Sequence, residues 1–281
     1  MYTTIVSTTV LAENLDNPQW VIIDCRFRLN DTEFGRRAYG AQHIPGAFYA
    51  HLDHDLSGRV VKGQTGRHPL PDPEVIAHTF SSWGIGPGVQ VAGYDDMGGA
   101  MAARLWWLLR WLGHSSVAIL DGGIAQWEAE GRPLVKEIPQ ARPGEFVPRV
   151  NGALAVNAST VEHLSSDPAT VIIDSRAAER YSGEFEPIDP VAGHIPGAVN
   201  LPHFFNVGPD GRFLPPEVIR ENFLQVLEGR EAAQSILYCG SGVTAAHNLV
   251  AMEYAGLHGA KLYPGSWSEW ITDPARPVAH S

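Results

Sequence analysis

The chain is poor in cysteine, with two among its 281 residues, Cys25 and Cys239. They stand in different local contexts, so a structural disulfide is not expected, and a reducing compartment suits the sequence. No uninterrupted apolar run approaches the length that spans a bilayer, and residues 1–15 lack a basic start followed by an apolar core. We therefore expect a cytoplasmic protein that does not associate with membranes.

Basic residues are also scarce, since 20 Lys and Arg face 31 Asp and Glu and give a net charge of −11. A nucleic-acid partner is not expected, because binding to phosphate backbones needs a basic face. The sequence has neither a Cys/His cluster of zinc spacing nor a Gly-Lys-Ser/Thr phosphate loop, so it implies no metal and no cofactor. With 44% apolar residues, the chain can bury a sizeable core, and its length suggests about two domains.

The chain repeats itself after about 150 residues. Val21-Ile-Ile-Asp-Cys-Arg26 returns as Val171-Ile-Ile-Asp-Ser-Arg176, and the His-Ile-Pro-Gly-Ala of residues 43–47 returns at 194–198. A period of this length is far too long for a solenoid and indicates the duplication of a domain.

This repeat sets the expected domain boundaries. We expect domains over residues 1–136 and 151–281, joined by a proline-containing linker over 137–150. Within each copy, short Val/Ile-rich runs alternate with helical stretches such as 100–112 and 243–255. That alternation predicts an α/β fold, with a mostly parallel sheet flanked by helices in each half.

Cys239 lies in a glycine-rich turn between an expected strand, 235–238, and an expected helix, 243–255. Gly240 and Gly242 permit tight backbone turns there. Several backbone N–H groups then converge on the sulfur, and the positive end of the helix lies behind it. Such a nest favours an anion and lowers the pKa of the thiol. Because thiolate is the reactive form, Cys239 is the expected nucleophile.

The first half differs at this point. Aligning Tyr94 with Tyr238 puts Asp95 in the place of Cys239, so the first domain has lost its nucleophile. We expect it to supply scaffold and one wall of the site. Cys25 follows a probable strand without a glycine-rich turn, and it is expected to be a structural, buried residue.

Taken together, these features resemble the tandem-domain rhodanese family over nearly the whole chain: two copies of Asp-x-Arg and His-Ile-Pro-Gly-Ala, and a cysteine loop in the second copy. The loop over residues 239–244 is similar to that of the 3-mercaptopyruvate sulfurtransferases, whereas thiosulfate sulfurtransferases of the family carry basic residues after the cysteine. The resemblance implies two rhodanese-like domains and sulfur transfer from 3-mercaptopyruvate to a thiol or cyanide, with a thioredoxin-like protein among the acceptors to consider.

The chemistry of the loop supports the same reaction. A thiolate attacks a sulfur atom, keeps it as a persulfide on Cys239, and passes it to a second thiol or to cyanide, which predicts ping-pong kinetics. The terminal sulfur is anionic and needs donors around it. The expected donors are the backbone of Gly240, Gly242 and Val243 and the hydroxyls of Ser241 and Thr244.

A neutral loop favours 3-mercaptopyruvate over thiosulfate, whose two charges are better met by lysine or arginine beside the sulfur. The resemblance implies that Arg180, in the segment 179–181, binds the substrate carboxylate. A second arginine usually follows in the family, but Ile188 occupies that place here. The alternative for Arg180 is a surface salt bridge with a nearby glutamate.

The segment Arg67-His-Pro-Leu-Pro71 resembles a family segment whose histidine works with an acid and the loop serine. His68 would take that role, and Asp53 is the best-matching acid. A histidine can move the proton needed when the leaving enolate is protonated. The alternative is that His68 caps a turn before Pro69.

Residues shared by both copies are expected to be scaffold, because one copy has no nucleophile. They are His43 and His194 in the repeated turns, and Asp24 and Asp174, paired with backbone or with Arg26 and Arg176. Trp267 and Trp270 are expected to pack a helix near the C-terminus.

Other functions are weighed against sulfur transfer. Protein phosphatases also place a cysteine loop after a strand, but they need an arginine six positions later, where this chain has Ala245. Thiosulfate:cyanide sulfurtransferase activity is the runner-up among enzymes. A persulfide carrier or regulatory module with little small-molecule turnover is the remaining alternative.

Overall fold

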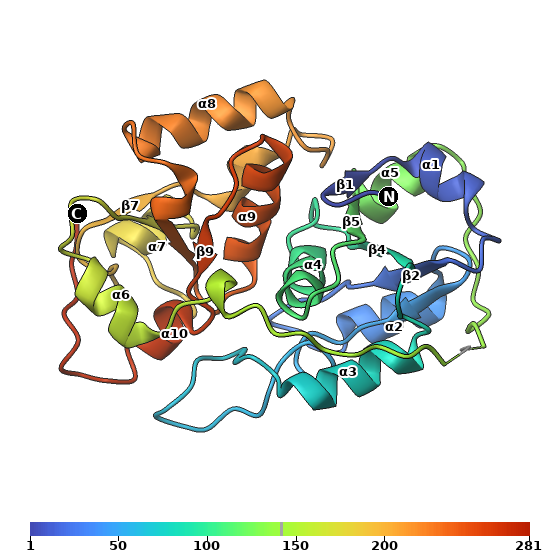
Figure 1. Cartoon of the computed structure of the whole chain (residues 1–281), viewed down its shortest axis with the longest axis horizontal. Coiled ribbons are helices and arrows are strands. Elements are labelled where there is room, and N and C mark those ends of the chain that lie inside the picture. Colours follow the sequence, from blue (N-terminus) through green and yellow to red (C-terminus); the bar gives the residue numbers. More distant parts are fainter. Residues whose placement is uncertain (141–142) are drawn as a thin grey trace. The chain divides into compact units, whose positions relative to one another are not determined.

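The computed structural model describes residues 1–140 and 143–281, which form two compact units (Figure 1). Unit 1 comprises residues 1–57, 71–151 and 207–213, and unit 2 comprises residues 58–70, 152–206 and 214–281. Residues 141 and 142 fall in the expected linker and lie outside the described residues. Residues 58–70, from the first half of the sequence, therefore belong to unit 2, and residues 207–213, from the second half, belong to unit 1.

Unit 1 is built on a parallel sheet whose order, within the described residues, is β1-β5-β4-β2-β3. The strands are β1 (Ile5–Val6), β2 (Trp20–Asp24), β3 (Ala47–Tyr49), β4 (Gln90–Tyr94) and β5 (Val117–Leu120). The helices are α1 (Thr8–Glu13), α2 (Phe34–Ala41), α3 (Pro73–Ser82), α4 (Ala102–Trp111) and α5 (Gly123–Ala129). Strands β4 and β5 are buried throughout, and α4 packs on both of them.

Unit 2 repeats this plan with the described order β7-β6-β8-β9, again with parallel pairing. Its strands are β6 (Val171–Asp174), β7 (Ala198–Asn200), β8 (Ser235–Tyr238) and β9 (Lys261–Leu262). Its α-helices are α6 (Ala158–Leu164), α7 (Ala178–Ser182), α8 (Pro216–Leu227), α9 (Thr244–Tyr254) and α10 (Ser266–Trp270). Three short 3₁₀ helices are described as well, over Gly152–Leu154, His203–Asn206 and Ala232–Gln234. The predicted α/β fold is confirmed in both halves.

Local sequence signals account for several element ends. The Asp72 side chain accepts the Glu74 N–H at 2.9 Å and caps α3, whose first residue is a proline. Asn157 caps α6 in the same way by accepting the Thr160 N–H at 2.9 Å. The central strands read as continuous apolar runs because helices cover both faces of a parallel sheet.

The two sheets bring equivalent residues to equivalent places. Asp24 on β2 is in register with Tyr94 on β4, and Asp174 on β6 is in register with Tyr238 on β8. Asp95 and Cys239 follow these tyrosines directly, so each begins the loop after an equivalent strand. In open parallel sheets this carboxyl edge is where ligands bind.

The repeated Asp-x-Arg motifs form matching buried ion pairs. Arg26 contacts Asp24 at 2.6 Å in unit 1, and Arg176 contacts Asp174 at 2.6 Å in unit 2. Each arginine also donates to a backbone carbonyl at 2.7 Å, that of Gln42 or that of Gly193. A buried charge is normally paired in this way, and the arrangement agrees with a scaffold role.

The repeated histidines also have matching contacts. Nδ1 of His43 lies 2.8 Å from the Tyr39 carbonyl, and Nδ1 of His194 lies 2.8 Å from the Tyr181 carbonyl. Each imidazole stacks on the same tyrosine with ring centroids 3.9 Å apart. Because both units use the histidine in the same two contacts, these contacts agree with a scaffold role in the turn.

Three other residues lie where the sequence places them. Trp267 and Trp270 are fully buried in the core of unit 2. Cys25 is buried in unit 1, where burial, followed by the charges of Asp95 and Asp24, raises the pKa of its thiol well above the ordinary value. A thiol of this kind stays protonated and unreactive, as expected for a structural cysteine.

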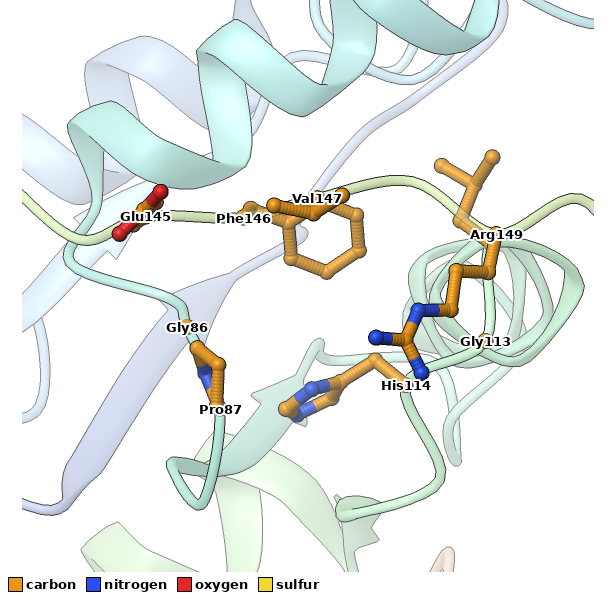
Figure 2. Close-up of a pocket in the computed structure, with 9 residues that line it drawn as sticks. Gly86, Pro87, Gly113, His114, Glu145, Phe146, Val147 and Arg149 are labelled. Atoms are coloured by element: carbon orange, nitrogen blue, oxygen red, sulfur yellow. The ribbon is translucent and has the colours of Figure 1, made fainter.

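The described part of the expected linker packs on unit 1. The Gly144 N–H donates to the Ser81 carbonyl at 2.8 Å, and the Arg149 N–H donates to the Leu112 carbonyl at 2.9 Å. Beside it lies a pocket of about 250 Å³, where Figure 2 shows His114 and Arg149 across from Pro87. This pocket includes none of the residues of the cysteine loop.

Across residues 1–140 and 143–281, no helix combines the length and apolarity that crossing a bilayer requires.

Candidate active site

The cysteine loop runs from the end of β8 at Tyr238 to the start of α9 at Thr244. Gly242 has a φ of 74°, in the left-handed region, and a Cβ there would stand 2.3 Å from the Pro264 carbonyl oxygen. Glycine is therefore required at this turn. The turn directs the Gly242 N–H to the sulfur of Cys239, 3.2 Å from the amide nitrogen.

Cys239 is 2% exposed, yet the environment of its thiol is polar. Burial by itself would raise the pKa of the thiol. Hydrogen bonds from the Thr244 hydroxyl and from the N–H groups of Ser241, Ala245 and Val243 outweigh that effect and lower the pKa below its ordinary value. The ring of inward-facing amides expected from the sequence is thus present, and it favours the thiolate.

The start of α10 holds this loop from behind. Ser266 Oγ accepts the Cys239 N–H at 3.1 Å, and the Trp267 N–H donates to the Cys239 carbonyl at 2.9 Å. The Ser268 N–H donates to the Gly240 carbonyl at 2.9 Å. The sequence indicates the two packing tryptophans here but not these loop contacts, since Ser266 and Ser268, next to buried tryptophans, give no separate signal.

His68 and Ser241 come together in unit 2. His68 Nδ1 lies 2.7 Å from Ser241 Oγ, and both side chains are buried. The expected contact between the histidine and the loop serine is therefore present. Ser241 lies two residues after the nucleophile Cys239. Asp53 belongs to unit 1, where its N–H donates to His51 Nδ1 at 3.1 Å, and its partnership with His68 stays a prediction.

Arg180 on α7 borders the cysteine loop. Its Nε donates to Glu186 at 2.9 Å and its Nη2 donates to Asp189 at 2.9 Å. A Cβ on Gly240 would stand 3.5 Å from both Nη1 and Nη2 of Arg180. The salt bridge with a nearby glutamate, the alternative expected for Arg180, is present. Both side chains of this pair are largely buried, and the pair lies beside the cysteine loop.

Arg67 is a second cation at the loop that the sequence analysis did not identify. Its Nη1 pairs with Asp189, and its Nη2 lies 2.7 Å from the position of a Cβ on Gly240. Ile188, at the place of the expected second arginine, is 43% exposed and contributes its N–H to Glu186. The available hint was that Arg67 directly precedes His68.

One cluster in the described part of unit 1 has residue types that ligate metals. Donor atoms of Glu33, His51 and His54 lie within 4.8 Å of one another. His51 Nδ1 accepts the Asp53 N–H at 3.1 Å, and its Nε2 lies 3.5 Å from a carboxylate oxygen of Glu33. The His51 and His54 rings stack with their centroids 4.3 Å apart.

The chain is similar to known proteins in both sequence and structure. A family model for the rhodanese-like domain matches residues 7–130 and 157–273. The chain is 50% identical over 270 residues to a probable 3-mercaptopyruvate sulfurtransferase of Pseudomonas aeruginosa, covering 96% of this chain and 95% of that protein. It is 37% identical to a putative thiosulfate sulfurtransferase of Mycobacterium tuberculosis, covering 92% and 89%.

Among solved structures, the chain is similar to the 3-mercaptopyruvate sulfurtransferase from Leishmania major. The TM-score is 0.84 at 30% identity, and the match covers 98% of this chain and 75% of that one.

Proposed function

The chain belongs to the rhodanese family, and from this premise we propose that it is a sulfurtransferase that moves sulfur from 3-mercaptopyruvate to a thiol or cyanide through a persulfide on Cys239. The observation that carries the proposal is the buried Cys239 thiol whose pKa the surrounding hydrogen bonds nevertheless lower. A thiolate held in this way is a nucleophile prepared for attack.

In the first half-reaction, the Cys239 thiolate attacks the sulfur of 3-mercaptopyruvate. A sulfur–sulfur bond forms while the carbon–sulfur bond breaks, and its electron pair leaves with the organic fragment as the enolate of pyruvate. Protonation of the enolate carbon completes pyruvate. In the second half-reaction, a thiolate or cyanide attacks the outer sulfur and returns the Cys239 thiolate, which gives ping-pong kinetics.

The outer sulfur of the persulfide carries negative charge and must be held. The N–H groups of Ser241, Val243 and Ala245 and the Thr244 hydroxyl, which lower the pKa of Cys239, are the donors we assign to it. Because these groups are preformed by the loop, they need no reorganisation during the reaction.

His68 and Ser241 serve the organic fragment. We assign the Ser241 hydroxyl to the ketone oxygen of the donor, where charge develops as the enolate forms. His68, 2.7 Å from that hydroxyl, is the group that moves the proton to the enolate, with Asp53 as the acid predicted to orient it.

The substrate carboxylate is assigned to Arg180 and Arg67. Both guanidinium groups reach the neighbourhood of Gly240, next to the nucleophile. A planar guanidinium suits a carboxylate, since its N–H groups form parallel hydrogen bonds to the two oxygens. Arg67 would then supply the cation that Ile188 does not.

We also propose a sulfur acceptor and a cellular compartment for the reaction. A thioredoxin-like protein, with a reactive thiol of its own, is a suitable acceptor for the outer sulfur. Cys25 and Cys239 are both free thiols, which supports the reducing cytoplasm as the working compartment.

Thiosulfate is the second candidate donor. Two arginines beside the loop could bind a dianion, and a 37% identical relative is named a putative thiosulfate sulfurtransferase. The ratio of kcat/KM for the two donors decides between them, with cyanide as the common acceptor.

Mass spectrometry of the Cys239 peptide tests the proposal. After incubation with 3-mercaptopyruvate, the peptide should gain one sulfur atom, and cyanide should remove it as thiocyanate, while the Cys25 peptide stays unchanged. Absence of the added sulfur would contradict the covalent mechanism. Loading that is efficient but followed by turnover no better than that of a free thiol would support the persulfide carrier instead.

A further inference from the structure

Asp189 joins the two arginines at the cysteine loop. One of its carboxylate oxygens accepts from Arg67 Nη1, and the other accepts from Arg180 Nη2 at 2.9 Å. Its side chain is 2% exposed, so solvent and salt screen the bridge weakly. The carboxylate therefore fixes the two guanidinium groups as a pair.

The bridge leaves other N–H groups of both arginines beside the nucleophile. Arg67 Nη2 and Arg180 Nη1 lie 2.7 and 3.5 Å from the position of a Cβ on Gly240. Arg67 Nε is buried, and it has no hydrogen-bond partner within the part of the chain that the structure describes. A buried donor without an acceptor is costly, which fits a group whose acceptor is a ligand.

Two acids balance the two arginines. Glu186, with a side chain 3% exposed, accepts from Arg180 Nε at 2.9 Å. Glu186 is also contacted by Arg176, which pairs with Asp174, so the network of three arginines and three acids is formally neutral. Burial raises the pKa of Asp189, and the contacts with Arg67 and Arg180 oppose that rise and favour its charged form. A neutral group can bind a carboxylate through directed hydrogen bonds, but it offers no net positive charge to a second negative charge.

From this arrangement we propose that Asp189 sets the donor specificity of the site, by cancelling the positive charge that would otherwise attract the thiosulfate dianion in preference to the 3-mercaptopyruvate monoanion. The inference rests on the proposed function, because it concerns the donor of the same site. Asp189 contacts the arginines that bind the donor, so it is a positioning residue.

The substitution Asp189→Asn tests this inference, because it keeps the shape of the side chain and removes one negative charge. We expect kcat/KM for thiosulfate to rise, and the ratio of kcat/KM for 3-mercaptopyruvate to that for thiosulfate to fall about tenfold. The thiosulfate reaction should also become more sensitive to ionic strength. A ratio within about twofold of the wild-type value in a folded variant would overturn the inference.

Two further variants separate charge from structure. Asp189→Glu keeps the charge and should return the ratio toward the wild-type value, even if overall activity falls. Glu184→Gln makes the same change of charge at an exposed residue of the same loop, and it should leave the ratio unchanged. An equal shift in Glu184→Gln would mean a general charge effect and would overturn the role of Asp189.

If Asp189→Asn does not fold, as judged by circular dichroism, Arg67→Gln tests the inference in the opposite direction. Removing a positive charge should weaken thiosulfate use more than 3-mercaptopyruvate use, so the ratio should rise, and an unchanged ratio would overturn the inference. Failure of the wild-type protein to load sulfur from either donor would instead remove the proposed function itself. Loading from both donors with a ratio insensitive to these variants would remove the specificity inference alone.

Discussion

The loop after β4 and the loop after β8 begin at equivalent strand ends and hold different groups. In unit 1, the buried Asp95 carboxylate accepts four backbone N–H groups, from Met97, Gly99, Met101 and Ala102, at 2.7 to 2.9 Å. In unit 2, the N–H groups that lower the pKa of Cys239 include those of Ser241, Val243 and Ala245. In both loops, the N–H groups of the second, fourth and sixth residues after Asp95 or Cys239 donate to that residue's side chain. The first half therefore has the same arrangement of inward-facing amides, with a carboxylate in place of the thiol.

The side chains around the two loops differ more than their amides do. Where unit 2 has Gly240 and Ser241 after the cysteine, unit 1 has Asp96 and Met97 after Asp95. The residue before the tyrosine that stacks on the repeated histidine is Arg180 in unit 2 and Ala38 in unit 1. A nest of amides holds an anion, but the hydroxyl and the cations beside it make the site suitable for a substrate.

The largest expected effect is loss of the nucleophile. Cys239→Ser should reduce sulfur transfer by at least about a thousandfold, because no thiolate is left to form the persulfide. Cys25→Ser, at the buried cysteine of unit 1, should keep most of the activity. Steady-state rates with 3-mercaptopyruvate and cyanide measure both. Transfer retained in the Cys239 variant would show that Cys239 is not the nucleophile that distinguishes the second half.

The free energy of unfolding should depend more on the loop residue of unit 1 than on that of unit 2. Asp95→Ala leaves four buried N–H groups without their acceptor and should lower the free energy of unfolding by about 3 kcal/mol. Cys239→Ala also removes an acceptor, but sulfur is a weak acceptor, so the loss should be smaller, about 1 kcal/mol. Urea unfolding followed by circular dichroism compares them. Equal losses would mean that the carboxylate in unit 1 is no more structural than the thiol in unit 2.

Arg180→Ala should have a smaller effect on the reaction. Loss of charged hydrogen bonds to the carboxylate should raise KM for 3-mercaptopyruvate about 10- to 100-fold, with a lesser change in kcat. Unit 1 has Ala38 at the equivalent sequence position. Saturation kinetics measure the effect, and an unchanged KM would remove Arg180 from the substrate site.

The smallest effect is a shift in reactivity with pH. Thiolate forms as the pH rises through the pKa, and the pKa of Cys239 is lowered while that of Cys25 is raised. Labelling of Cys239 by iodoacetamide should therefore reach half its maximal rate at a lower pH than labelling of a free thiol, while Cys25 stays unlabelled. Peptide mass spectrometry after short exposures follows both, and earlier labelling of Cys25 would contradict the comparison.

The parts of the site that the sequence predicts are those that depend on neighbouring residues. The strand, the glycine turn and the helix start around Cys239 lie within one short segment, so their chemistry can be recognised locally. The arrangement of Arg67 with Asp189 joins residues 122 positions apart, and that of His68 with Ser241 joins residues 173 apart. His68 was found through a family resemblance of the segment 67–71, which gave no role to Arg67, and the contact of Arg67 with Asp189 depends on tertiary structure.

The assignment of residues 58–70 to unit 2 and of 207–213 to unit 1 has an evolutionary consequence. A gene cut between the repeats would part Cys239 from His68 and Arg67, and each fragment would lack a piece of its own body. Neither half of the sequence therefore contains all the residues of its own unit. Selection that keeps Cys239 together with His68 and Arg67 must therefore keep both halves in one chain.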